Sequence, residues 1–294
     1  MTSTLPQQRT LTAGCKVNLY LDITGVRPNG YHELHTLFVP LAEPADTLTV
    51  TPAEGSGLRL TCSRPELEGP DNIIIKAYEA FAEATGFRPG LRVHLDKRIP
   101  FGAGLGGGSS DAAAILRYLN NSAGQAALEH TALSALATRI GADVPFFLMD
   151  GPAWATGIGE ELVPAELDLA GFTLVVLCPD IHVSTPWAYA AWDAAHPATQ
   201  KNEKRPECLT CAASAGKCFP CSAFLLHNSF EHVVFGAFPK LRQLKEALLR
   251  QGAAGAVMSG SGSSLCALFR NRQDAERAVL TFRQEQVPAF FHSF

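Results

Sequence analysis

A glycine-rich stretch in the first half of the chain places the strongest constraint on what this sequence can form. Five of the seven residues from 102 to 108 are glycine, and Ser109 and Ser110 follow them directly. The alanines and leucines from Asp111 to Leu119 predict a helix immediately after this loop. A loop with so few side chains can turn its backbone N–H groups toward an anion, and the start of the helix adds partial positive charge. The stretch therefore predicts a phosphate-binding loop, in which the two serine hydroxyls contact phosphate oxygens or a phosphate-bound Mg²⁺.

Three other interpretations of this loop compete with that prediction. Gly102, Gly104 and Gly107 match the dinucleotide-binding pattern G-x-G-x-x-G, but no acidic residue follows at about 20 positions within a βαβ unit. A Walker A loop is excluded, because Gly108 and Ser109 stand where that motif requires Gly-Lys-Ser/Thr. A flexible connector is the third alternative, although connectors rarely combine this many glycines with a strong helix start. We therefore favour the phosphate-binding interpretation.

A second glycine cluster spans residues 258–264, between two apolar stretches. By itself this cluster is compatible with a simple turn. Taken together with the first loop, it predicts a second wall around a polyphosphate or a substrate. Gly260, Ser261 and Gly262 are therefore candidate substrate-binding residues.

The composition indicates a globular protein and excludes several kinds of partner. The 294 residues are 47% apolar and 18% charged, which is enough for one large or two ordinary domains. A net charge of −4 offers no basic surface for nucleic acid or anionic lipid, so an anionic substrate has to be held by a few placed donors. No apolar run reaches the roughly 18 residues of a membrane-spanning helix, and residues 1–10 lack the features of a secretory signal. The sequence therefore predicts a cytoplasmic protein without nucleic-acid or membrane partners.

Strand and helix patterns alternate irregularly along the chain, which predicts an α+β fold with two lobes. Asp71 is a candidate N-cap for the first helix, and a break near Glu43 and Pro44 divides the second strand region. We predict an N-terminal domain at 1–165 and a C-terminal domain at 166–294, with a polar and cysteine-rich excursion at about 194–222. The predicted strands cover 11–24, 31–50, 91–95 and 172–177, and the predicted helices 72–84, 111–119, 131–140, 239–251 and 273–285.

Lys16 and Asp143 form a pair of candidate catalytic residues. In phosphoryl transfer, a carboxylate near the acceptor hydroxyl orients it and accepts its proton, and a neighbouring lysine steadies the charge on the transferred group. Each residue also has a structural alternative. Asp143 precedes Pro145 and could be a helix N-cap, while Lys16 could be an exposed strand residue. Spacing alone leaves these alternatives open.

Four segments together resemble one kinase family. Residues 13–34 are similar to the first motif of the diphosphocytidyl-methylerythritol kinases. Residues 100–113 resemble the ATP loop of the wider galactokinase, homoserine kinase, mevalonate kinase and phosphomevalonate kinase (GHMP) superfamily. Residues 141–147 with 157–161 resemble a third block of the family, and 255–264 its C-terminal glycine motif. The resemblance covers most of the chain and implies a two-lobed GHMP-kinase fold, with an N-terminal ATP-binding lobe and a C-terminal ferredoxin-like α/β lobe.

The resemblance also implies an activity. It implies transfer of the ATP γ-phosphate to the 2-hydroxyl of 4-diphosphocytidyl-2-C-methyl-D-erythritol, in isoprenoid precursor synthesis by the non-mevalonate route. Lys16 and Asp143 would be the catalytic pair, and Mg²⁺ would accompany ATP. The residues implied on the ATP side are Asn72, Lys97, Pro100, Phe101, Gly102, Ala103, Gly104, Leu105, Gly106, Gly107, Gly108, Ser109 and Ser110.

On the acceptor side, the resemblance implies that Asn18, Tyr31 and His32 line the cytidine. An aromatic ring can stack on the base, and a histidine can hydrogen-bond its edge. From the residues alone, a packed aromatic and a loop histidine are the simpler interpretations. One segment departs from the family pattern, which has Asn-Asp where this chain has Asn228 and Ser229, so Ser229 is assigned no role.

Two cysteine pairs distinguish the excursion. Their C-x-x-C spacing predicts a structural Zn²⁺ site, although the six-residue spacer between the pairs is shorter than in zinc ribbons. An iron–sulfur centre, a redox-sensitive surface loop and chance clustering are the alternatives. The prediction is checked by elemental analysis, which should find about one equivalent of zinc. The four residues are Cys208, Cys211, Cys218 and Cys221.

Two other functions compete with the predicted kinase. Another superfamily kinase would use a different small-molecule acceptor, such as homoserine or a sugar, and Tyr31 with His32 argues against it by favouring a nucleotide-bearing acceptor. A catalytically silent nucleotide-binding regulatory protein with a zinc-stabilised loop belongs to a different class. The presence of both Lys16 and Asp143 argues against that second alternative.

Overall fold

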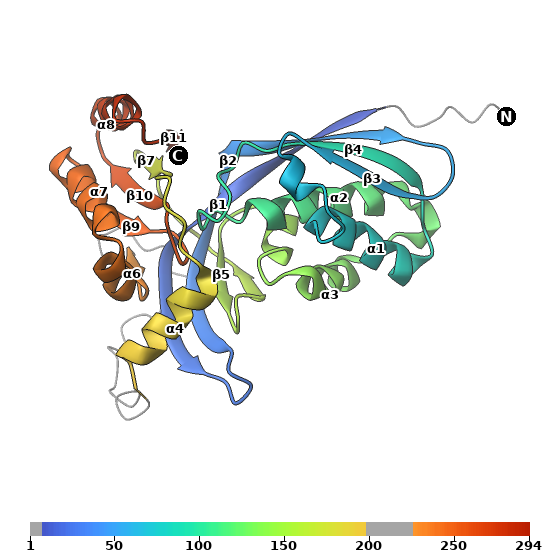
Figure 1. Cartoon of the computed structure of the whole chain (residues 1–294), viewed down its shortest axis with the longest axis horizontal. Coiled ribbons are helices and arrows are strands. Elements are labelled where there is room, and N and C mark those ends of the chain that lie inside the picture. Colours follow the sequence, from blue (N-terminus) through green and yellow to red (C-terminus); the bar gives the residue numbers. More distant parts are fainter. Residues whose placement is uncertain (1–7, 198–225) are drawn as a thin grey trace. The chain divides into compact units, whose positions relative to one another are not determined.

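The computed structural model describes residues 8–197 and 226–294, and two compact units can be distinguished in it (Figure 1). Strands β1 (Arg9–Val26) and β2 (His32–Pro52) contribute residues to both units. Strands and helices are mixed in each unit, which confirms the predicted α+β class. The predicted domain limits of 1–165 and 166–294 stay a prediction. Unit 1 comprises Met1–Lys16, Pro40–Phe101 and Gly106–Asp150, and unit 2 comprises Val17–Val39, Gly102–Leu105 and Gly151–Phe294.

Unit 1 packs three helices against a sheet. Its strands follow the order β3-β4-β2-β1, in which β3 (Gly57–Cys62) is parallel to β4 (Gly90–Asp96) and β4 is antiparallel to β2. Figure 1 shows helices α1 (Ile73–Thr85), α2 (Gly107–Ser122) and α3 (His130–Ile140) together on one side of these strands. Alternating apolar residues of the strands and the apolar stripes of the helices form one core. This core holds the start of α2 in place.

Local residues set the ends of these helices. Asn72 is the N-cap of α1, because its Oδ1 accepts a hydrogen bond from Ile74 N at 2.9 Å. The prediction of Asp71 as N-cap was therefore wrong by one residue. Gly86, with φ of 72°, ends α1 in a left-handed conformation. Helix α2 begins at Gly107, four residues earlier than predicted, since the glycines of the loop already adopt helical geometry there.

The second strand region is continuous. The sequence predicted a break near Glu43 and Pro44, but β2 runs through both residues. They lie between the part of β2 that pairs with β5 (Ala153–Thr156) at positions 36–38 and the part that pairs with β4 at 47–52. A proline at a position between two ladders removes no hydrogen bond from either of them. The strand therefore accommodates it.

Unit 2 contains a separate four-stranded antiparallel sheet of order β11-β7-β10-β9. The central strand β7 (Thr173–Leu177) is buried at every position, between β10 (Leu265–Phe269) and β11 (Ala289–Ser293), and β9 (Gly255–Met258) is the outer strand beside β10. Helices pack on this sheet as in a ferredoxin-like lobe, which confirms the predicted fold class. They are α6 (Glu231–Ala237), α7 (Pro239–Arg250) and α8 (Arg272–Gln284) (Figure 1).

The remaining elements of unit 2 surround its parts of β1 and β2. Strand β5 pairs with β2 and with β6 (Glu161–Pro164), and β8 (His227–Asn228) lies parallel to β1 at Tyr20 and Leu21. Helix α4 (Thr185–Ala195) follows β7 in the chain. Short 3₁₀ turns complete unit 1 at Pro65–Leu67, Gly124–Ala126 and Pro145–Leu148, the last of which we call η3.

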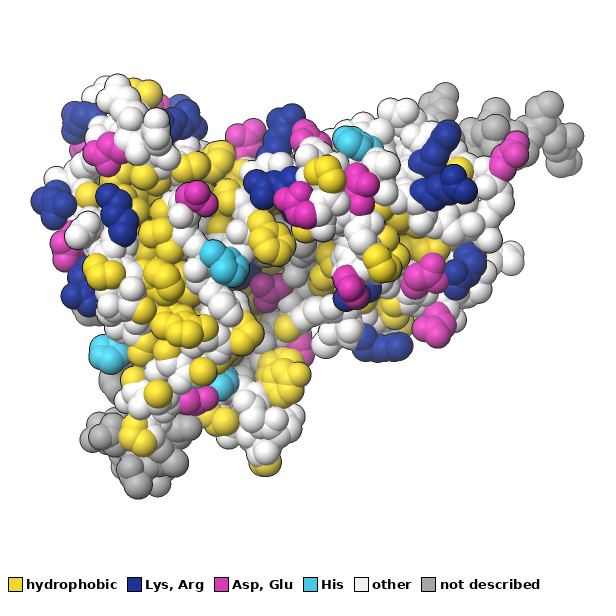
Figure 2. All heavy atoms as spheres, viewed as in Figure 1, with side chains coloured by type: hydrophobic (Ala, Val, Ile, Leu, Met, Phe, Trp, Pro, Cys, Tyr) yellow, Lys and Arg dark blue, Asp and Glu magenta, His cyan; other side chains and the backbone are white. Residues whose placement is uncertain are grey.

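Among the helices of the described residues, none combines the length and the apolar character that crossing a membrane requires. On the face drawn in Figure 2, Lys and Arg side chains are interspersed with Asp and Glu. That face of the described chain therefore presents mixed charge, as the modest net charge of −4 leads one to expect.

Candidate functional site

Lys16 and Asp143, which are 127 positions apart, meet in unit 1. The Lys16 Nζ lies 3.4 Å from Asp143 Oδ2, and the two side chains are 5% and 32% exposed. Lys16 projects from β1, while Asp143 lies in the turn between α3 and η3, where Gly141 ends α3 and Val144 N donates to Gly141 O at 3.0 Å. The N-cap position of η3 is Val144, so the alternative interpretation of Asp143 as an N-cap has no support. A buried ammonium beside a half-exposed carboxylate is an arrangement that can hold and deprotonate a hydroxyl group.

The start of α2 lies next to this pair. Gly106 is the N-cap of α2 with φ of 70°, and it supplies no side-chain cap, so the first N–H groups of the helix remain available to an anion. A Cβ on Gly106 would lie 3.0 Å from the Phe147 ring and 3.1 Å from Lys16 Cγ. Only glycine therefore allows the backbone of the loop to approach the stem of Lys16 this closely. The positive end of α2 and the lysine ammonium together favour negative charge.

A buried cluster of Lys97, Asp46 and Asp111 holds the same helix in place. The Lys97 ammonium contacts a carboxylate oxygen of Asp46 and lies 2.9 Å from Asp111 Oδ2. Asp46 Oδ1 also accepts hydrogen bonds from Arg98 N at 2.6 Å and Ile99 N at 2.8 Å. Asp111 belongs to the second turn of α2, so the cluster ties this helix to the segment that follows β4. Lys97, predicted on the adenosine side, thus has two intramolecular partners.

Burial and charge shift the pKa values in this cluster. Burial raises the pKa of Asp111 to about 7, and the neighbouring Asp46 carboxylate adds to this effect while Lys97 opposes it. Asp111 Oδ1 has no hydrogen-bond partner within the described residues. For Lys97, burial disfavours the charged form, but the attraction of Asp111 and Asp46 outweighs it and raises the pKa above its ordinary value. The cluster therefore keeps its lysine charged and takes up a proton on Asp111 near neutral pH.

The other predicted ATP-side residues differ in their burial and in the hydrogen bonds that they make within the protein. Asn72 uses its side chain within unit 1, since its Nδ2 donates to Leu67 O at 2.7 Å and its Oδ1 caps α1. Phe101 is 68% exposed. Ser109 is half-buried at the first turn of α2, and Ser110 is buried with its N–H bonded to Gly106 O at 2.9 Å. Ser109 thus presents its hydroxyl more readily than Ser110 does. The ATP contacts of all these residues stay a prediction.

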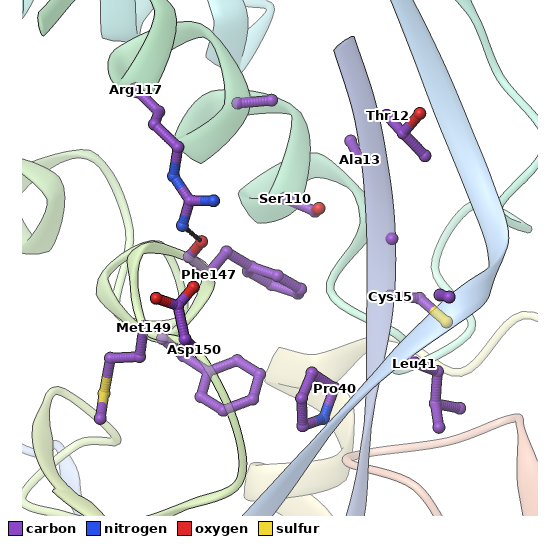
Figure 3. Close-up of a pocket in the computed structure, with 14 residues that line it drawn as sticks. Thr12, Ala13, Cys15, Pro40, Leu41, Ser110, Arg117, Phe147, Met149 and Asp150 are labelled. Carbon is purple, nitrogen blue, oxygen red and sulfur yellow. Dashed lines mark hydrogen bonds between the residues drawn. The ribbon is translucent and has the colours of Figure 1, made fainter. Parts of the chain in front are cut away.

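The side chain of Ser110 lines a pocket of about 570 Å³ in unit 1 (Figure 3). It is lined by residues 12–15 of β1, residues 40–42 of β2, one side of α2 and residues 146, 147, 149 and 150. Figure 3 shows the Ser110 hydroxyl turned toward β1, while the Arg117 guanidinium donates to Phe147 O at 2.9 Å. Ser110 thus contributes its side chain to this pocket.

In unit 2, the second glycine cluster packs against the first part of the glycine loop. A Cβ on Gly104, whose φ is 76°, would lie 2.3 Å from Ser259 O, so the two backbones touch there. Ser259 Oγ donates to Gly104 O at 3.0 Å and accepts from Asn18 N at 3.0 Å, and Ser264 N donates to Ala103 O at 3.1 Å. The Asn18 side chain donates to Thr36 Oγ1 at 2.7 Å. The structure thus brings the two predicted glycine segments together, with Asn18 beside them.

Asn228 holds the second cluster from the other side and was missed by the sequence analysis. Its Nδ2 donates to Met258 O at 2.6 Å and to Gly260 O at 2.7 Å, and its Oδ1 accepts from Phe230 N at 2.8 Å. Ser229, which was assigned no role, donates to Asp22 Oδ1 at 2.8 Å. The family pattern, which also has Asn at the position of Asn228, was the available signal, but the sequence analysis considered only the departure at Ser229. Ser261 contacts Thr185 Oγ1 at 2.8 Å.

His32 lies in a pocket of aromatic side chains from α4. Its ring stacks on Tyr189 with centroids 4.4 Å apart and meets Trp192 edge-on at 5.7 Å. Its Nε2 lies 3.0 Å from Asp193 Oδ1. The neighbouring Tyr31 is 58% exposed, whereas His32 is 8% exposed. No local sequence signal marks Asp193, because it is 161 positions from His32.

The predicted zinc ligands Cys208, Cys211, Cys218 and Cys221 lie outside the described residues. Within residues 8–197 and 226–294, no group of three or more His, Cys, Asp or Glu side chains could hold a metal ion. The four cysteines in this part of the chain are all buried, at positions 15, 62, 178 and 266.

Comparison with known proteins assigns the family. A model of the GHMP kinase N-terminal domain matches residues 72–151, and a model of the GHMP kinase C-terminal domain matches residues 216–288. The 4-diphosphocytidyl-2-C-methyl-D-erythritol kinase of Solidesulfovibrio magneticus is 52% identical over 93% of this chain and 92% of its own. The enzyme of the same name from Nitratidesulfovibrio vulgaris is 50% identical over 96% and 98%. This chain belongs to the 4-diphosphocytidyl-2-C-methyl-D-erythritol kinase family of GHMP kinases.

Solved structures agree with this assignment. A crystal structure of 4-(cytidine 5'-diphospho)-2C-methyl-D-erythritol kinase matches 96% of the chain with a TM-score of 0.76 and 37% identity, and 98% of that structure is covered. A homoserine kinase from Cytophaga hutchinsonii, at 18% identity and a TM-score of 0.69, shares the fold. The GHMP kinase described here is therefore an ATP-dependent enzyme that acts on a small molecule.

Proposed function

We propose that this GHMP kinase transfers the γ-phosphate of ATP to the 2-hydroxyl of 4-diphosphocytidyl-2-C-methyl-D-erythritol, a step of non-mevalonate isoprenoid precursor synthesis in the cytoplasm. The names of relatives that are 50–52% identical over nearly the whole chain support this substrate. The observation that carries the proposal is the Lys16–Asp143 pair, 3.4 Å apart, beside the uncapped start of α2. That arrangement joins a proton acceptor, a cation and an anion-binding helix end.

Asp143 orients the acceptor hydroxyl and takes its proton as the oxygen attacks phosphorus. The carboxylate is half-exposed, so a hydroxyl can reach it, and Lys16 Nζ holds it from the buried side. The ammonium attracts the negative charge of the transferred group. Because phosphoryl transfer needs little covalent assistance, this positioning and charge neutralisation are the main contributions of the protein.

The loop from Pro100 to Ser110 binds the phosphates of ATP. The residues fit such a group, because Gly106 brings the loop backbone against the Lys16 stem and leaves the first N–H groups of α2 to an anion. Mg²⁺ bound with ATP would neutralise phosphate charge, and the half-buried Ser109 would offer it a hydroxyl ligand besides water. Asn72 and Lys97 support the adenosine side by ordering α1 and α2, respectively.

Tyr31 and His32 bind the cytosine of the acceptor. The exposed Tyr31 ring offers a face for stacking, and the buried His32 ring offers a polar edge. Asn18 and the backbone around Gly260, Ser261 and Gly262 contribute to the same acceptor. Asn228 keeps this second glycine cluster in its conformation through the bonds to Met258 O and Gly260 O.

Release of ADP with and without the diphosphocytidyl acceptor tests the proposed function. We expect release that depends on this acceptor and is absent with homoserine or a sugar. In the Asp143→Asn variant, kcat should fall about 10²- to 10⁴-fold because the proton acceptor is lost, while the Kd for ATP stays within about twofold.

Asp168→Asn is the matched control, since Asp168 is exposed and accepts a hydrogen bond from Ala170 N at 3.0 Å. It should keep the kcat of the unmodified enzyme. Turnover of Asp143→Asn within a few-fold of the unmodified enzyme would remove Asp143 from the mechanism. Equal ADP release with every acceptor would reject the proposed substrate.

A further inference from the structure

Asp193 of α4 holds one edge of His32, and among residues 8–197 and 226–294 the other edge has no hydrogen-bond partner. The Asp193 Oδ1 is 3.0 Å from His32 Nε2. Within the described residues, no hydrogen bond involves His32 Nδ1, and this atom is not among the buried polar atoms that lack a partner. A carboxylate oxygen only accepts hydrogen bonds, so Nε2 has to be the protonated nitrogen. In the neutral ring, Nδ1 then carries a lone pair and accepts.

The surroundings of His32 hold the ring in this orientation. Tyr189, Trp192 and Asp193 occupy positions i, i+3 and i+4 of α4, so their side chains lie on one face of that helix. Tyr189 stacks on the imidazole at 4.4 Å, and Trp192 packs edge-on against it at 5.7 Å. Rotation of the ring would break these contacts together with the bond to Asp193. Helix α4 thus supplies both the packing and the carboxylate that fix His32.

We propose that Asp193 is a positioning residue that sets the tautomer of His32, and that this tautomer makes the enzyme select an amino-bearing base over a keto-bearing one. This inference rests on the proposed function, in which the acceptor carries cytosine. The exocyclic amino group of cytosine donates hydrogen bonds, so it pairs with the lone pair on Nδ1. Uracil presents a carbonyl oxygen at the same place, and two acceptors repel one another. Asp193 therefore determines specificity without touching the substrate.

The test compares the cytidine acceptor with its uridine counterpart in two variants of Asp193. In Asp193→Asn, the amide can donate to Nε2, which moves the ring proton to Nδ1 and turns the acceptor into a donor. We expect the KM for the cytidine acceptor to rise about tenfold or more with kcat nearly unchanged. The ratio of kcat/KM between the cytidine and uridine acceptors should fall by at least the same factor. Asp193→Glu, which keeps the carboxylate, should restore most of the selectivity.

The ring proton can be located directly. In protein labelled with ¹⁵N-histidine, the chemical shifts of the two ring nitrogens show which one is protonated, and His32→Gln identifies the His32 signals. We expect Nε2 to be protonated in the unmodified enzyme and Nδ1 to become protonated in Asp193→Asn. If Asp193→Asn merely unfolded the protein, the ¹⁵N shifts of all the histidines would change. The proposal predicts a change in the ring-nitrogen shifts of His32 alone. Asp274→Asn is the control, since Asp274 pairs with Arg277 on α8 of the same unit.

Two results would overturn the proposal. One is a cytidine-to-uridine ratio in Asp193→Asn equal to that of the unmodified enzyme, and the other is an unmodified His32 protonated at Nδ1. Failure of the proposed function gives a different result, because the unmodified enzyme would then phosphorylate neither acceptor. The ¹⁵N measurement on the enzyme without substrate still decides the role of Asp193 in that case.

Discussion

At the scale of single residues, the chemistry of this kinase depends on where charge is buried. Lys16 and Lys97 are both almost completely buried, yet they serve different ends. Lys16 faces one half-exposed carboxylate, so its partner is able to contact a substrate. Lys97 faces two buried carboxylates and links α2 to the end of β4. The exposure of the acidic partner therefore distinguishes Lys16, which we propose to be catalytic, from the anchoring Lys97.

The raised pKa of Asp111 predicts a dependence of stability on pH. Asp111 holds its proton up to about pH 7 in the folded protein, whereas in the unfolded chain it loses the proton near its ordinary pKa of 3.8. Between these values the unfolded state binds fewer protons, so this group lowers the free energy of unfolding as pH rises toward 7. In Asp111→Asn this contribution is absent. We expect the variant to gain a few kcal/mol relative to the unmodified protein between about pH 4 and pH 8.

Urea unfolding of both proteins at pH 5 and pH 8 measures this difference. Asp168→Asn is again the control, because that aspartate is exposed. Parallel changes of the unfolding free energy in the unmodified protein and Asp111→Asn would contradict the assignment. The assignment is supported if the unfolding free energy falls from pH 5 to pH 8 in the unmodified protein and in Asp168→Asn, and falls less in Asp111→Asn.

At the scale of elements, the glycine loop depends on close backbone contacts as well as on flexibility. Gly104 and Gly124 both have positive φ values, of 76° and 56°, but their surroundings differ. A Cβ on Gly104 would meet Ser259 O at 2.3 Å, while one on Gly124 would meet nothing within 4 Å. An alanine at Gly124 would therefore lose stability only through the left-handed conformation, whereas an alanine at Gly104 would also clash with Ser259 O.

Gly104→Ala should therefore be more destabilising than Gly124→Ala. We expect Gly124→Ala to cost about 1 kcal/mol, from backbone conformation alone. Gly104→Ala should cost about 2–4 kcal/mol, since the methyl group also forces apart the two glycine segments. It should weaken ATP binding as well, whereas Gly124→Ala should leave ATP binding unchanged. Urea unfolding and ATP titration measure both effects, and equal losses in the two variants would contradict the close approach.

Element boundaries show where local sequence is informative. The predicted helices 72–84 and 131–140 end within one residue of α1 and α3, and Gly86 and Gly141 are the residues that follow the last helical ones. The start of α2 was predicted at Asp111, where the run of alanines and leucines begins, and glycine has low helix propensity. The helix in fact begins at Gly107, which packs against Ile99 with a would-be Cβ only 2.9 Å from Ile99 Cγ2. Tertiary packing overrides propensity at that position.

At the scale of the whole molecule, neither compact unit is a continuous stretch of chain. The core around the four-stranded sheet of unit 2 includes Leu21, Ile23 and Leu34, which come from β1 and β2. Each such side chain stabilises the fold by about 1.5–3 kcal/mol when fully buried. Their sum is comparable to the total stability of a typical domain, about 5–15 kcal/mol. The C-terminal half therefore depends on the N-terminal strands.

A fragment of residues 151–294 should consequently be less stable than the same residues in the full chain. We expect it to show a lower Tm than the full chain, or no cooperative transition, because its core lacks those three side chains. Differential scanning calorimetry of the fragment and the full chain makes the comparison. Addition of residues 17–39 through a linker should recover part of the stability. A fragment as stable as the full chain would show that β1 and β2 contribute little to this core.

The sequence by itself determined the α+β class and the glycine loop with its helix, because each depends on residue types and their periodicity along the chain. The family resemblance added Lys16 and Asp143 as candidates. Only the tertiary structure placed Lys16 beside Asp143, Lys97 between Asp46 and Asp111, and Asp193 against His32. These pairs are separated by up to 161 positions. Chain spacing carries no information about such contacts, since they form when strands and helices pack and bring distant side chains within hydrogen-bond distance.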